Sequence, residues 1–210
     1  KYLRHTGKRP LLGLTGGSDS RGLFAALKDQ SPYLFTWVRS KSGDQFSSAD
    51  TKAARRIAEK FDLEVDVWPL KSPSLNDADD RFGRAFRKST AYYRGIASGW
   101  LRKLSEKNFA YDDHLHVRGF GGEILRGFYQ ETNGRITAVN ASQLSNAYDV
   151  NSGSRVTREA FARFIETTQF DQALMGRDPS DLFYWEHRMG TWGSIAMSEA
   201  DIAGRSMVGY

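Results

Sequence analysis

"LLGLTGGSDSRGLFAAL", residues 11 to 27, joins an apolar run to a helical pattern through a pair of glycines. The run 11–15 predicts a short buried strand, and from Arg21 to Asp29 apolar residues recur at helical spacing. A strand that ends in glycines and leads into a helix is a recurrent way to hold phosphate. Backbone N–H groups converge there on the anion, and the helix N-terminus adds a partial positive charge. The alternative interpretation is a tight strand-to-helix turn that binds nothing.

The alternation of short apolar runs and amphipathic helices continues downstream. We expect strands within 31–38 and 63–70, and between them a helix that begins with a capping box of Ser47 and Asp50. "HLHVRGFGGEI", residues 114–124, predicts a fourth strand that runs into a glycine turn. This order predicts an α/β fold, a parallel twisted sheet flanked by helices with right-handed crossovers, followed by a helical C-terminal segment.

Two regions follow from this pattern. We expect residues 1–130 to form a nucleotide-binding α/β core and residues 131–210 to form a helical segment that packs on the core and is truncated at its end. In the second region, Thr157 can cap one helix, and the pair Asp178-Pro179 can begin another.

Composition narrows the class of protein. The 210 residues are 40% hydrophobic, which is enough for a packed core, and they contain no run of about eighteen apolar residues that would span a membrane. The net charge of +5 favours a phosphate-bearing partner, beside the alternative of an ordinary solvated surface. The absence of cysteine excludes disulfides and thiolate sites here and is in line with a cytoplasmic location. Because the sequence begins at Lys1 without a methionine or a signal peptide, we expect a fragment or a processed piece.

The glycine loop has a specific match. Residues 15–20, Thr-Gly-Gly-Ser-Asp-Ser, resemble the pyrophosphate loop of the PP-loop ATP pyrophosphatases, whose signature reads Ser-Gly-Gly-x-Asp-Ser. Thr15 differs from the signature but keeps the hydroxyl. The loop is neither a Walker loop, since no Gly-Lys-Ser/Thr follows, nor a dinucleotide fingerprint.

A second stretch, "VRGFGGEILRGFY" at 117–129, resembles the second signature of the asparagine synthetase branch, roughly Ser-Gly-x-Gly-x-Asp-Glu-x-x-Gly-Gly-Tyr. Glu123 stands in place of an acidic residue that helps to hold magnesium in that family. Two departures are Phe120, where asparagine synthetases have a carboxylate, and Ile124, where they have a glutamate. The positions that match are Gly119, Gly121, Gly127 and Tyr129.

The resemblance implies an adenine nucleotide alpha hydrolase-like fold that binds ATP and Mg²⁺, with Asp19 and Glu123 as metal ligands. These two residues and Arg188 are the catalytic candidates, although the aromatic helix that carries Arg188 is also explained by core packing of Phe183, Trp185 and Trp192. We expect the adenine to lie at the end of the second strand. The residues expected to bind the nucleotide are Thr15, Gly16, Gly17, Ser18, Asp19, Ser20, Arg21, Trp37, Val38, Arg39, Gly119, Gly121 and Gly122.

The resemblance further implies a carbon–nitrogen ligase. Such an enzyme cleaves ATP to AMP and pyrophosphate to adenylate a carboxylate, which an amine or ammonia then attacks. Phe120 predicts an acceptor with apolar bulk and no asparagine formation, because burying a charge against its ring without a partner would cost several kcal/mol. A glutaminase domain or subunit is a candidate partner. The alternative is a catalytically degenerate nucleotide-binding or assembly module, which Phe120 and Ile124 favour.

Two other patterns in the sequence are weaker indications of function. His114 and His116 share a strand face and could bind a metal, but nothing nearby completes a ligand set. The stretch 81–95 interleaves arginine with aromatic residues, as nucleic-acid-binding proteins do. Amphipathic helices show the same pattern, and we do not expect nucleic acid as a partner.

Overall fold

The computed structural model describes residues 5–39, 48–70, 80–90, 95–107, 109, 113–119, 122–125, 127–131, 135–149, 151–202 and 207–208. The chain forms two compact units, which are described separately. Unit 1 consists of residues 1–120 and 195–210, and unit 2 of residues 121–194. The sequence-based division at residue 130 assigned 121–130 to the nucleotide-binding core, whereas the structure groups this segment with the helices that follow it.

Unit 1 contains a five-stranded sheet in the order β3-β2-β1-β4-β5, and every neighbouring pair is parallel. In register, Leu12 of β1 lies opposite Leu34 on one side and Val117 on the other. The predicted α/β fold with a parallel sheet is therefore confirmed, and its first strand lies in the interior of the sheet. The strands are β1 (Arg9–Gly13), β2 (Tyr33–Arg39), β3 (Val65–Leu70), β4 (His114–Val117) and β5 (Met207–Val208).

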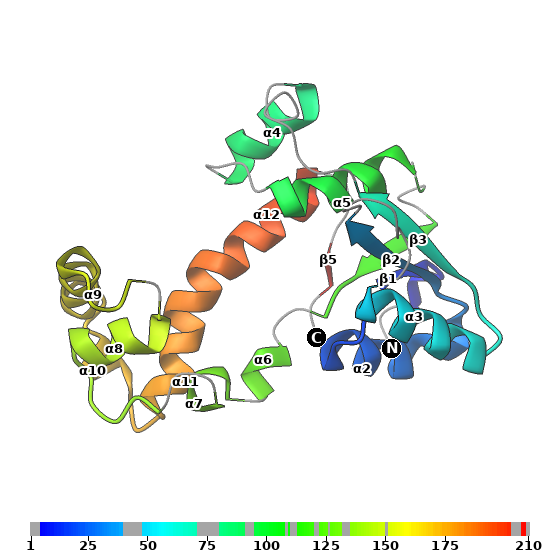
Figure 1. The fold of residues 1–210 in the computed structure, drawn as a ribbon. Helices are drawn as coiled ribbons and strands as arrows, with labels where there is room; N and C mark the ends of the chain where they lie inside the picture. The colour runs from blue at the N-terminus through cyan, green and yellow to red at the C-terminus, as the bar shows by residue number, and fades with distance from the viewer. Residues whose placement is uncertain are drawn as a thin grey trace. The chain divides into compact units, whose positions relative to one another are not determined.

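Helices cover both faces of this sheet, as a parallel sheet requires. Leu11 of β1 packs with residues of α4 and α5, whereas Leu12 and Leu14 pack with α2 and α3. Figure 1 shows α2 and α3 on one face of the sheet and α5 on the other. The helices of this unit are α2 (Ser18–Leu27), the short η1 (Lys28–Gln30), α3 (Ala49–Lys60), α4 (Arg81–Thr90), α5 (Gly95–Glu106) and α12 (Ser194–Ile202), whose first residue belongs to unit 2.

Two predicted helix starts were wrong. Helix α3 is capped by Ser48, whose Oγ accepts the N–H of Thr51 at 3.1 Å, and the predicted partner Ser47 lies outside the described residues. The N-cap of α9 is Ser154 and not Thr157, because Arg155 and Val156 are already helical. In both cases the N-cap is a serine close to the predicted residue.

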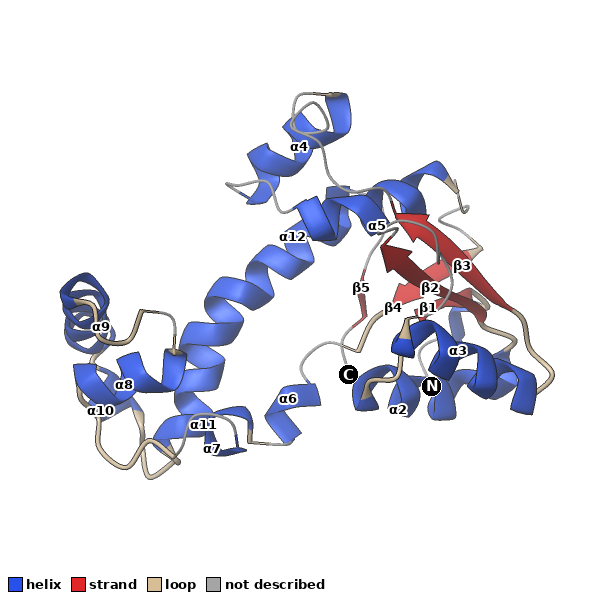
Figure 2. Cartoon of the chain, in the orientation of Figure 1, coloured by secondary structure: helices blue, strands red, loops and turns tan. Residues whose placement is uncertain are grey.

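Unit 2 is helical, as expected for the C-terminal part of the chain (Figure 2). Tyr129, Ile136, Phe161, Phe170 and Phe183 are members of its buried core. The core packing predicted for Phe183 is confirmed, whereas 53% of Trp185 is exposed. The elements are α6 (Gly122–Leu125), α7 (Phe128–Glu131), α8 (Ala141–Tyr148), α9 (Arg155–Thr168), α10 (Phe170–Ala173), α11 (Pro179–Phe183) and the π-helix η3 (Tyr184–Gly193).

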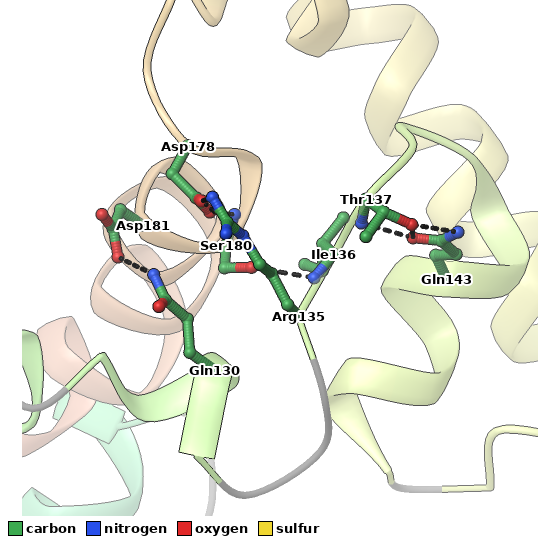
Figure 3. Close-up of polar contacts among 8 residues, drawn as sticks. All are labelled: Gln130, Arg135, Ile136, Thr137, Gln143, Asp178, Ser180 and Asp181. Carbon is green, nitrogen blue, oxygen red and sulfur yellow. Dashed lines mark hydrogen bonds and ion pairs between the residues drawn. The ribbon is translucent and has the colours of Figure 1, made fainter.

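A polar network fixes the start of α11 (Figure 3). The predicted start at Asp178-Pro179 is confirmed, since the carboxylate of Asp178 accepts the N–H of Ser180 at 2.8 Å and Pro179 occupies the first turn. Arg135 forms an ion pair with Asp178, and the hydroxyl of Ser180 accepts the buried N–H of Ile136 at 2.9 Å. These contacts attach the segment around Ile136 to the start of α11.

Candidate functional site

The strand order places a switch point between β1 and β4. From β1 the chain continues to β2 on one side of the sheet, whereas β4 lies on the other side of β1. In open α/β sheets, ligands bind at the carboxyl ends of the strands beside such a reversal. The loop 14–17 after β1 and residues 118–119 after β4 occupy this position.

Gly119, after β4, lies against Asp19 in the first turn of α2, directly after the loop 14–17. A Cβ atom built on Gly119 would lie 2.9 Å from the Cβ of Asp19 and 3.1 Å from its carbonyl carbon. Side chains do not tolerate such distances, so the approach requires glycine at position 119. The two glycine-containing motifs, 15–20 and 117–129, therefore meet at Asp19 and Gly119, while Phe120 and Gly121 lie outside the described residues.

Side-chain oxygens bind successive amides of the loop after β1. The N–H of Thr15 donates to the Oγ of Ser20 at 3.1 Å, and the N–H of Gly17 donates to the Oγ1 of Thr15 at 3.1 Å. The N–H of Gly16 donates to the Oδ1 of Asp50, in the first turn of α3, at 2.9 Å. Thr15 and Ser20, predicted to bind the nucleotide, therefore shape the loop with their hydroxyls.

The start of α2 offers further donors. The N-cap residue of α2 is Gly17, and no side chain at this position accepts a hydrogen bond from the first turn. The first-turn N–H groups of a helix also lack acceptors within the helix. Ser18 is exposed at this end, and the Nε of Arg21 donates to the carbonyl of Gly17 at 3.4 Å. Amides, a hydroxyl and a guanidinium thus surround one helix start, which is a chemically suitable environment for a phosphate.

The residues expected at the adenine end have a different environment. The ring of Trp37 stacks on Trp100 with centroids 5.6 Å apart, and Val38 is buried. Trp37 thus packs against the core and Val38 is part of it, while Arg39 ends β2 and its side chain is not described. Recognition of adenine at this position would thus depend on the backbone at the end of β2.

The donor set around Asp19 fits a magnesium-bound phosphate. Mg²⁺ is usually held by one or two carboxylates together with phosphate oxygens and waters, so an all-protein cage is not needed. Asp19, in the first turn of α2, supplies one such carboxylate next to the loop. In the part of the chain that the structure describes, no three histidine or acidic residues form a metal-binding group.

Glu123 lies in unit 2 and has partners there. Its Oε2 accepts hydrogen bonds from the hydroxyl of Tyr184 and from the Nε of Arg188, both at 3.0 Å. The guanidinium of Arg188 lies 4.3 Å from the ring centroid of Phe128 and 4.8 Å from that of Trp192. Glu123 and Arg188, two predicted catalytic residues, are thus brought together, and Gly122 is buried at the start of α6 beside them. The role of Glu123 as a metal ligand stays a prediction.

The surroundings of this ion pair shift the pKa of Arg188 and of the neighbouring Tyr184. Burial lowers the pKa of Arg188, but the hydrogen bond and the charge of Glu123 outweigh this effect and raise it. Burial, followed by the charge of Glu123, raises the pKa of Tyr184 well above its usual range. Arg188 therefore stays charged and Tyr184 stays protonated, and both act as hydrogen-bond donors to one carboxylate.

Comparisons with known proteins add no assignment. No protein-family model matches the chain, and no curated protein matches it.

Two residues of these clusters were missed by the sequence analysis. Asp50 was interpreted as part of a helix cap, and Tyr184 was not considered. The spacing of Tyr184 and Arg188, four residues apart on one helix, could have indicated a shared partner. His114 and His116, considered as metal ligands, pack against the rings of Phe109 and Trp100.

The described residues include no helix that is both long and apolar enough to cross a membrane.

Proposed function

We propose that this chain binds ATP with Mg²⁺ at the carboxyl ends of β1 and β4 and uses it to adenylate a carboxylate. The observation that carries the proposal is the approach of Gly119 to Asp19, with only 2.9 Å between a Cβ built on Gly119 and the Cβ of Asp19. It supports a single site built from both glycine motifs at the switch point of the sheet. A simple turn after β1 would not need a second glycine loop against it.

Each part of the loop has a distinct task in this proposal. The N–H groups at the start of α2 and the hydroxyl of Ser18 donate hydrogen bonds to phosphate oxygens. Asp19 holds the metal ion, which supplies charge neutralisation for the leaving pyrophosphate when bound. Thr15 and Ser20 keep the loop in shape through their hydrogen bonds.

The proposed reaction has two steps. A carboxylate oxygen of the acceptor attacks the α-phosphorus, the P–O bond to the bridging oxygen breaks, and pyrophosphate leaves with the electron pair. An amine nitrogen then attacks the acyl carbon, the C–O bond to AMP breaks, and the amine loses a proton. The loop contributes by positioning the phosphates and by donors aimed at the charge on the departing pyrophosphate.

The acceptor follows from Phe120, which stands where asparagine synthetases have a carboxylate. An apolar ring at this position favours an acceptor with apolar bulk, such as a peptide or a lipophilic acid, over free aspartate. We therefore expect no asparagine from aspartate, ATP and ammonia. Robust asparagine formation would show that Phe120 does not select the acceptor.

The test is to measure AMP and pyrophosphate release from labelled ATP with Mg²⁺ across a panel of carboxylic acids. Release that depends on one class of acid, and that falls in Gly119→Ala but not in Gly22→Ala, is the expected result. ATP binding without release for any acid would favour the nucleotide-binding module. No ATP binding at all would remove the proposal.

A further inference from the structure

Asp50 carries a carboxylate that is directed at the loop after β1. Its Oδ1 accepts the N–H of Gly16 at 2.9 Å, and a Cβ built on Gly16 would lie 3.2 Å from the same oxygen. The carboxylate is not needed to cap its own helix, because Ser48 does so. The carboxylate of Asp50 is therefore available to bind the amide of Gly16 in the loop.

The chemical type of this acceptor matters. The neighbouring amides of Thr15 and Gly17 are bound by neutral hydroxyl oxygens, whereas the amide of Gly16 is bound by a carboxylate oxygen. An anionic oxygen at 2.9 Å from a loop amide is what a phosphate would present. Asp50 thus occupies one of the donors that a phosphate oxygen would use, and it adds a negative charge to a loop suited to anions.

This charge discriminates between ligands. A like charge about 4 Å away costs about fivefold in affinity even at the dielectric constant of water, and more where water is excluded. Magnesium cancels part of the negative charge of a nucleotide phosphate, so the metal-bound form is repelled less. We propose that Asp50 is a specificity-determining residue that makes the loop select magnesium-bound nucleotide phosphates and reject metal-free anions. This inference rests on the proposed function.

The experiment compares the full chain with Asp50→Asn, which keeps an acceptor oxygen but removes the charge, and with Asp50→Ala, which removes both. Glu59→Gln is the matched control, because it removes the same charge from an exposed position near the other end of α3. Calorimetric titrations at low ionic strength use pyrophosphate with EDTA, ATP with EDTA, and ATP with excess MgCl₂. Circular dichroism checks that each variant is folded. If Asp50→Ala does not fold, the titrations of Asp50→Asn alone decide the test.

We expect Asp50→Asn to bind metal-free pyrophosphate at least about fivefold more tightly than the unmodified chain and to bind Mg-ATP about equally. The control should change neither affinity. Unchanged pyrophosphate affinity in Asp50→Asn would overturn the inference. So would a selective loss of Mg-ATP affinity, which would make Asp50 a metal ligand.

The failure of this inference can be distinguished from failure of the proposed function. If the unmodified chain does not bind Mg-ATP, the proposed function is wrong. The pyrophosphate titration of Asp50→Asn then still decides the inference. A gain in affinity supports repulsion by Asp50 at an anion-binding loop, and no gain overturns it.

Discussion

Arg188 donates from Nε to the Oε2 of Glu123 at 3.0 Å, and its guanidinium lies 4.3 Å from the ring centroid of Phe128. The side chains of the pair are only 23% and 20% exposed. An ion pair with so little water contact is screened weakly, and removal of one partner leaves a charge without compensation. This relationship predicts strong coupling between two residues that are distant in sequence.

The first prediction is a coupling energy of about 1–3 kcal/mol between Glu123→Gln and Arg188→Met, from a double-mutant cycle on unfolding in urea. The exposed pair of Arg155 and Glu159 on α9 serves as the comparison, and its coupling should be much smaller. Equal coupling in the two pairs would contradict the role of burial. If Glu123→Gln also leaves the magnesium dependence of ATP binding unchanged, Glu123 is not a metal ligand.

Gly119→Ala should disrupt the junction of the two loops. The new Cβ would lie 2.9 Å from that of Asp19, so the backbone must shift, at a cost of about 1–3 kcal/mol in the free energy of unfolding. Gly22→Ala is the matched change, because nothing lies within 4 Å of a Cβ built there, in the interior of α2. It should stabilise by about 0.5–1 kcal/mol, measured by chemical denaturation. Equal effects of the two changes would show that the close approach is not maintained.

Asp19→Asn should weaken the magnesium-dependent part of ATP binding about ten- to a hundredfold, because a charge-assisted contact is lost. The measurement is ATP affinity at rising magnesium concentration. Asp29→Asn is the control, since this exposed carboxylate beyond the end of α2 pairs with Lys28. A magnesium dependence that is the same in Asp19→Asn and the control would remove Asp19 as the ligand.

His187 should make the stability of the chain sensitive to acid. Burial, and then the charge of Arg188, lower its pKa below the ordinary value of 6.5, and its ring stacks on Phe183 at 4.9 Å. The unfolded chain therefore binds the proton more readily. Stability is full above pH 6.5 and falls as the pH drops below that value toward the lowered pKa of the folded state. Thermal melts between about pH 8 and pH 5 should show a smaller decline in His187→Phe than in the unmodified chain. Parallel declines would show that other groups control the acid sensitivity.

Ser180→Ala should destabilise unit 2 by about 1–3 kcal/mol, because the buried N–H of Ile136 loses its acceptor. Ser194→Ala gives the control. Ser194 is exposed to solvent, and its hydroxyl donates to nearby carbonyls at the end of η3, those of Gly190 and Thr191. Urea denaturation followed by tryptophan fluorescence measures both changes, and a loss in the control as large as that in Ser180→Ala would contradict the argument.

The sequence predicted the sheet well because its signals are local. Alternating apolar runs and helical periodicity predicted a parallel sheet containing β1 to β4, and the glycines after β1 marked the loop that leads into α2. The short β5 was missed, because residues 131–210 were all expected to be helical. Helix starts were less accurate, since Ser47 and Ser48 are equally good caps on sequence grounds. Only the packing of the folded chain decides between such neighbours.

The site could be predicted only in part, because several of its contacts join distant segments. Nothing in the local sequence indicates that Asp50 reaches Gly16 or that Tyr184 binds Glu123. The hydroxyls of Thr15 and Ser20 were expected to face a ligand and instead satisfy amides of their own loop. Buried or half-buried amides need acceptors, and in a short loop the nearest hydroxyl supplies them.

The pairing of β5 with β4 has a consequence for synthesis of the chain. Val117 pairs with Val208, so all of unit 2 is translated between the two partners. Until β5 has been synthesised and has paired with β4, the strand β4 presents an edge with unpaired backbone N–H and C=O groups. Such edges pair with strands of other molecules. Formation of this contact is also slow, because it closes a very long loop. The edge of β4 therefore stays open to other molecules until Met207 and Val208 have been synthesised, and pairing with β5 then closes it.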